Sequence, residues 1–100
     1  MSDFYEVTEI RVNEVAITFE SAKLEISSPI EEMHWYVHVT ETDFKPDATP
    51  NPNKVFHLNI VADEKMYGGP VNISQVTKYA GEKQHLRDIV FTGEPDKMER

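Results

Sequence analysis

The chain has no cysteine among its 100 residues. Disulfides, thiolate metal sites and cysteine nucleophiles are therefore excluded together. The first residues also show neither the basic start nor the apolar run of a signal peptide. The apolar runs are only a few residues long, far short of a membrane span. These absences predict a cytoplasmic protein that makes no contact with a membrane.

Leucine is scarce as well. The chain has three leucines, against 17 valines and isoleucines together and seven threonines. Residues branched at the β-carbon lose rotamer freedom in a helix and pack well on a pleated sheet. The composition therefore favours strands over helices.

Basic residues are outnumbered, with 10 Lys and Arg against 18 Asp and Glu, and the formal net charge is −8. The imbalance is concentrated in residues 1–32, which hold eight acids and two bases. Direct nucleic-acid binding is disfavoured, because it needs clustered Lys and Arg. The negative charge is compatible with a protein partner, including a basic one.

Apolar and polar residues alternate from Ile10 to Ile26, which is the period of half-buried strands. The phase flips at Asn13-Glu14, and a two-residue turn there pairs Val12 with Val15 and Ile10 with Ile17. A second turn at residues 20–23 would pair Phe19 with Leu24 and complete a three-stranded meander. Upstream, the phase also changes near Thr8, which predicts a bulge or a strand start there.

Further strands are expected at about residues 33–41, 54–61 and 86–92, the last of them central because Ile89-Val90-Phe91 is continuously apolar. Between them, Gly68-Gly69-Pro70 predicts a turn and residues 42–53 a proline-rich loop. Ile73, Val76 and Ala80 have helical spacing, so a short helix is expected near residues 74–80, with a strand over 71–77 as the competing interpretation.

The predicted fold is mainly β. It is a small antiparallel barrel or sandwich of about six strands, in a single domain over residues 1–100 with a disordered tail at 94–100.

The segment His34-Trp35-Tyr36-Val37-His38 raises the question of a metal site. Residues four apart on a strand are separated by ~13 Å, so His34 and His38 cannot share an ion. If residues 33–41 and 54–61 form a hairpin, one register places His38 opposite His57 and Tyr36 opposite Asn59. Opposed β-carbons lie ~5 Å apart, close enough for two imidazoles to share a metal ion.

These residues are the candidate binding set: His34, Tyr36, His38, His57 and Asn59, with His38 and His57 as candidate metal ligands. The spacing of residues predicts no catalytic constellation and no cofactor other than that metal ion. The preferred function is a non-enzymatic protein-interaction module. One alternative is a metal- or small-molecule-binding barrel built on His38 and His57. Another is an acidic decoy for a basic nucleic-acid-binding protein, using Glu9, Glu14, Glu20 and Glu25.

Overall fold

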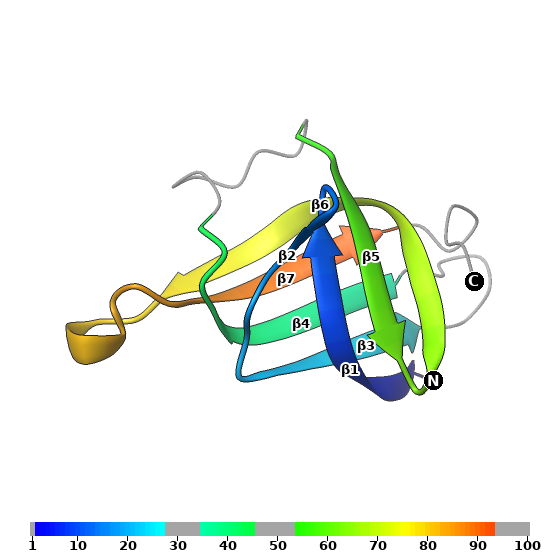
Figure 1. Cartoon of the computed structure of the whole chain (residues 1–100), viewed down its shortest axis with the longest axis horizontal. Helices are drawn as coiled ribbons and strands as arrows, with labels where there is room; N and C mark the ends of the chain where they lie inside the picture. The colour runs from blue at the N-terminus through cyan, green and yellow to red at the C-terminus, as the bar shows by residue number, and fades with distance from the viewer. Residues whose placement is uncertain (1, 28–34, 46–53, 94–100) are drawn as a thin grey trace.

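The computed structural model describes residues 2–27, 35–45 and 54–93. These residues form seven strands and one short 3-10 helix (Figure 1). The strands are β1 (Ser2–Val12), β2 (Val15–Ala16), β3 (Ser21–Ser27), β4 (Trp35–Thr42), β5 (Phe56–Ala62), β6 (Lys65–Lys78) and β7 (Arg87–Gly93), and the helix is η2 (Gly81–Lys83). The predicted mainly β fold is confirmed, whereas the expected disordered tail at 94–100 lies outside the described residues.

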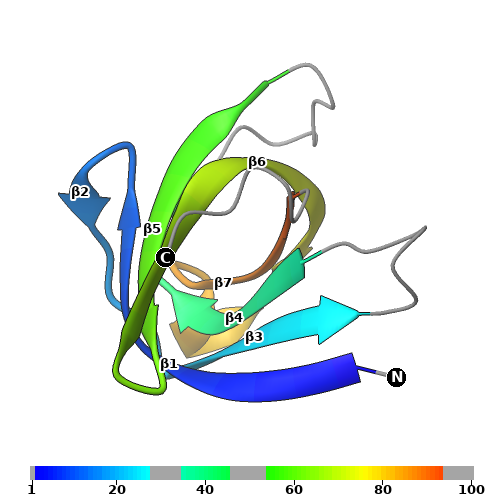
Figure 2. The same cartoon turned by 90° about the vertical axis from the view of Figure 1, so that its right-hand side faces the viewer.

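Six of the strands close into an antiparallel barrel in the order β1-β3-β4-β7-β6-β5, and pairing of β5 with β1 completes the ring (Figure 2). The short β2 adds to β1 outside this ring. In chain order, β1, β3 and β4 form one three-stranded meander, and β5, β6 and β7 form the other. The two meanders meet at the β4–β7 and β1–β5 pairs.

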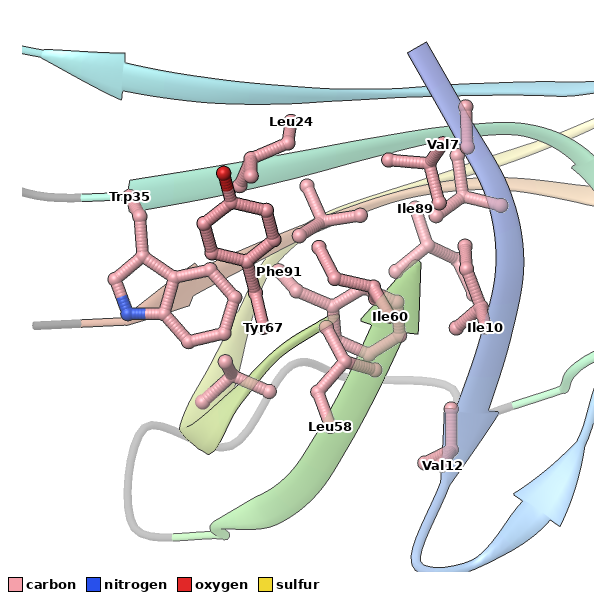
Figure 3. Close-up of a cluster of buried hydrophobic side chains, with 14 of the residues drawn as sticks. Val7, Ile10, Val12, Leu24, Trp35, Leu58, Ile60, Tyr67, Ile89 and Phe91 are labelled. Carbon is pink, nitrogen blue, oxygen red and sulfur yellow. The ribbon is translucent and has the colours of Figure 1, made fainter. Parts of the chain in front are cut away.

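The barrel interior is filled by the inward side chain of every second residue. Figure 3 shows this cluster, with Trp35 toward one end and Ile10 and Val12 toward the other. Trp35 is fully buried and lies directly against Gly93 on β7, where a Cβ would come within 2.3 Å of the indole Nε1. Any side chain at position 93 would therefore displace the ring.

Phe44 packs onto the core from just beyond β4. Its ring centroid is 5.9 Å from that of Phe56 and 6.2 Å from that of Phe91. The backbone N–H of Phe44 donates to the hydroxyl oxygen of the buried Thr42, over 3.1 Å. An aromatic residue in a predicted loop is thus part of the apolar packing of the barrel.

The turn at Asn13-Glu14 forms as predicted, with both residues at positive φ (50° and 70°) and with Val12 opposite Val15. The second predicted turn, at residues 20–23, is wrong, because Leu24 lies opposite Tyr5 rather than Phe19. The chain between β2 and β3 is hydrogen-bonded to β4, because the Glu20 N–H donates to the Thr40 carbonyl over 2.9 Å. It therefore continues along the same edge of β1 instead of reversing.

The short helix predicted near residues 74–80 is wrong, and the competing strand interpretation is confirmed, because β6 runs on to Lys78. The register of β6 against β7 shifts between Ile73 and Gln75, so one strand holds an extra residue there. Ile73 then faces Phe91 and Val76 faces Ile89, although they are three residues apart. A bulge has produced apolar spacing that is otherwise typical of a helix.

The turn predicted at Gly68-Gly69-Pro70 is also wrong, because these residues lie inside β6. The chain reverses earlier, at Asp63-Glu64, where both residues have positive φ (51° and 63°). Pro70 fits in the strand because of its cross-strand partner, His57. The His57 carbonyl points toward β1 and accepts a hydrogen bond from the Asn13 N–H over 2.8 Å. In an antiparallel ladder this makes the His57–Pro70 pair a non-hydrogen-bonded one, which needs no proline N–H.

Candidate binding surfaces

Part of the predicted histidine and tyrosine row exists on the outer face of β4. Tyr36 and His38 project outward with ring centroids 6.3 Å apart and planes inclined by 33°. His38 Nε2 lies 2.9 Å from Glu25 Oε1 on the neighbouring strand β3. Sequence reasoning did not place Glu25 at this site, because it did not predict that β3 and β4 are neighbours.

The other half of the predicted set lies across the barrel. His57 and Asn59 are on β5, and three steps around the ring separate β5 from β4 in either direction. The predicted hairpin register is therefore wrong, since His38 lies opposite Lys23 and Val90. The continuously apolar β7 takes the place beside β4 that the prediction assigned to β5.

This arrangement removes the geometric basis for a shared metal ion. His38 and His57 are on opposite sides of the barrel, and His34 lies outside the described residues. Within residues 2–27, 35–45 and 54–93, no three His, Asp or Glu side chains are grouped so that they could hold a metal. A barrel that binds metal through His38 and His57 is not supported by these positions.

A second polar cluster joins the β6–β7 hairpin to β4. The Tyr79 hydroxyl donates to Asp88 Oδ1 over 2.5 Å, and the Glu41 backbone N–H donates to the same oxygen over 2.9 Å. Lys83 Nζ reaches Glu41 Oε1, also over 2.5 Å. The hydrogen bond to the Asp88 carboxylate is the largest of the effects that raise the pKa of Tyr79 to about 12. The Asp88 contacts hold the base of a hairpin whose tip, with η2, projects from the barrel in Figure 1, and the Lys83 contact ties that tip to β4.

The outer face of β4, β7 and β6 has a shallow hollow of about 270 Å³. His38, Thr40, Gln75 and Asp88 contribute its polar lining. The hollow is small for a ligand pocket, since such pockets typically enclose ~300–1,000 Å³. It includes His38 but not Tyr36, and it gives His38 little depth in which to enclose a small molecule.

A larger hollow lies where β1 continues past the β5–β6 turn. It has a volume of about 520 Å³ and is lined by Phe4, Tyr5, Glu6, Thr8, Val61, Asp63 and Glu64. β1 pairs with β5 only from Val7 onward, because β5 ends at Ala62 and turns back. Across the described part of the chain, no strand pairs with this edge of Ser2–Glu6, whose other edge pairs with β3.

Large apolar side chains are exposed along this hollow. Phe4 is 59% exposed, and Val61 continues the surface into an adjoining hollow of about 350 Å³ that includes Met66. Sequence reasoning detected the change of phase near Thr8 but missed Phe4. The alternation shows that Phe4 and Tyr5 point to opposite faces of the sheet. Only the strand pairing shows that Phe4 lies on the outer face, beside an edge that no other described strand pairs.

The four carboxylates of the decoy hypothesis are not equivalent. Glu9 pairs with Arg11 at 3.3 Å, and Glu25 pairs with His38. Glu14 belongs to the turn after β1, and Glu20 lies in the connection that follows β2. Two of the four thus already contact a cationic or basic side chain, which leaves less charge for a partner.

None of the described helical residues forms a helix long and apolar enough to cross a membrane. Comparisons with protein-family models, with curated proteins and with solved structures found no match to this chain.

Proposed function

We propose that this chain is a non-enzymatic protein-binding domain that takes up an extended segment of its partner along the N-terminal half of β1. The observation that carries the proposal is the edge of Ser2–Glu6, which no described strand pairs beyond the β5–β6 turn. Such an edge presents backbone N–H and C=O groups in the spacing that another strand requires. A cytoplasmic location is part of the proposal, since a chain without cysteine needs no oxidising compartment.

Phe4 supports this assignment because it is a large apolar side chain beside the edge. It is 59% exposed and lines the 520 Å³ hollow together with Val61. Aromatic side chains that become buried on association supply much of the binding free energy of protein interfaces. Strand pairing would supply affinity, and the side chain facing Phe4 would supply specificity.

Selection of binders from a random displayed peptide library on the immobilised full chain tests the proposal. We expect recovered peptides, titrated by NMR, to shift the amides of residues 4–6 and 61–64. Phe4→Ala should weaken binding at least tenfold, since it removes the apolar anchor. The matched control is Val55→Ala, because Val55 is also 59% exposed but does not line this hollow. Shifts confined to Tyr36 and His38, or binding that ignores Phe4→Ala, would overturn the proposal.

A further inference from the structure

We propose that the segment taken up by β1 is cationic, with Lys or Arg side chains placed against Glu6, Asp63 and Glu64. This inference rests on the proposed function and adds the chemistry of the partner. Three of the seven residues that line the hollow are acidic, and none of the seven is Lys, Arg or His. Lys65 follows Glu64 in the chain but does not line the hollow.

The three carboxylates differ from the ion-paired acids of the barrel. Glu9, Glu25 and Glu41 each contact a cationic or basic side chain of the barrel. Within the described ranges, no ion pair involves Glu6, Asp63 or Glu64. Lys23 on β3 lies directly opposite Glu6 but forms no ion pair with it, and in the same ranges Asp63 and Glu64 form none either. Asp63 and Glu64 thus supply most of the charge left for a partner, and complementary charge favours encounter and excludes partners of the wrong sign.

The positions of these acids relative to the edge define a pattern in the partner. Phe4 and Glu6 are two residues apart on the outer face of one strand, so they stand ~7 Å apart along it. A neighbouring strand has the same period, and its side chains lie directly across at ~5 Å. A partner strand that fits presents an apolar residue opposite Phe4 and a cation two positions away, opposite Glu6.

A second copy of this chain is a poor occupant of the same edge. Pairing of two β1 edges would bring both sets of Glu6, Asp63 and Glu64 together, in a protein whose net charge is already −8. Charged side chains beside an open edge are one way in which proteins prevent edge-to-edge association. The acids therefore oppose self-association while admitting a cationic strand.

Three synthetic peptides with one Thr- and Val-rich strand sequence test the inference. They differ only at the outward positions, which carry Lys, Gln or Glu beside one conserved apolar residue. Binding to the full chain is measured by NMR titration at low salt and in about 0.5 M salt. We expect the Lys peptide to bind at least tenfold more tightly than the Gln peptide, the Glu peptide to bind least, and the differences to shrink in salt.

The double substitution D63N/E64G removes two of the charges and keeps the turn, because Asn-Gly suits two successive positive φ angles. It should abolish most of the preference for Lys over Gln. The control is Glu14→Gly, which removes one charge and creates the same Asn-Gly turn at the other pair of positive φ angles, away from the hollow.

The outcomes separate the two proposals. Equal binding of the Lys and Gln peptides, with Phe4 still required, would overturn the cationic partner and leave the protein-binding function standing. Binding that ignores Phe4→Ala, or no binding by any of the peptides or library-selected sequences, would overturn the protein-binding function itself. A dimer in sedimentation that Phe4→Ala dissociates would show that a second copy occupies the edge, and this too would overturn the cationic partner.

Discussion

The two halves of β1 belong to one strand but have different surroundings. Val7–Val12 pairs with β5, its last two residues also pair with β2, and its inward side chains Val7, Ile10 and Val12 are buried. Ser2–Glu6 pairs with β3 alone among the described strands. One half completes the barrel, whereas the other continues beyond it with an edge that no other described strand pairs.

The change occurs at the bulge between Val7 and Glu9, where Thr8 is the extra residue. A bulge reverses the side to which the following residues point, so Tyr5 and Val7 share the inner side with Ile10. It also bends the strand. Barrel closure removes a strand edge only as far as the neighbouring strand extends, and here β5 stops at Ala62.

The largest contrast should come from truncating one apolar side chain in each half. Ile10→Ala should lower the free energy of unfolding by about 2–5 kcal/mol, because it leaves a cavity in the core. Phe4→Ala should change it by no more than about 0.5 kcal/mol, because the ring is mostly exposed. Denaturant unfolding measures both. Equal losses would mean that Phe4 is part of the folding core, and the comparison between the halves would fail.

Deletion of Thr8 should put the inward-facing residues of the two halves of β1 on opposite faces of the strand. Without the extra residue, Tyr5 and Val7 would turn outward while Ile10 stays inward. Loss of the Val7 burial alone corresponds to about 1.5–3 kcal/mol of unfolding free energy. Thr8→Ala is the control, since it keeps the number of residues in the bulge and removes only the side-chain methyl and the exposed hydroxyl, which donates a long 3.4 Å hydrogen bond to the Val61 carbonyl. A deletion as mild as this control would show that the bulge does not set the phase.

Hydrogen exchange should distinguish the halves without any substitution. The slowest amides of Val7–Val12 should exchange at least tenfold more slowly than the slowest of Ser2–Glu6, which corresponds to about 1.4 kcal/mol in opening free energy. A bound peptide should slow exchange in the outer half and leave the inner half unchanged. Uniform exchange along β1 would contradict this comparison.

The smallest expected effect concerns the two turns that flank the halves. Glu14→Gly should stabilise the protein by about 0.4–1 kcal/mol, since glycine adopts the positive φ of 70° without strain. Glu64→Gly, at a φ of 63°, should give a similar gain beside the open half. The midpoint of thermal unfolding should rise by a few degrees in each variant. A fall in either midpoint would mean that the glutamate side chain has a stabilising contact.

Local features of the fold could be predicted from the sequence because they depend on neighbouring residues. Alternation located the strands other than β6, and the phase changes located the Asn13-Glu14 turn and, near Thr8, a bulge or strand start that proves to be a bulge. The same kind of bulge at Ser74 was misinterpreted, because Ile73 and Val76 then show the spacing of a helix. Inward residues that are three positions apart identify a bulge only when the chain is known to be a strand both before and after them.

The pairing of distant strands could not be predicted in the same way. The inward residues of β4 fit β5 and β7 equally well by pattern, and an adjacent hairpin is the common arrangement. The candidate His38–His57 pair depended on that choice and was lost with it. The edge of Ser2–Glu6 that no other described strand pairs was missed for the same reason, since it depends on where β5 ends.

The two meanders meet at two seams, the β1–β5 pair and the β4–β7 pair, and these seams affect how quickly the chain folds. One seam joins Val12 to Leu58 and the other joins Trp35 to Gly93, so both depend on residues that are far apart in sequence. Proteins with mostly non-local pairings lose much chain entropy before those contacts form, and they fold in about milliseconds to seconds. During that interval the strands that later close the ring are open edges too. The acids beside β1 would then also limit wrong pairing between chains while the ring is still open.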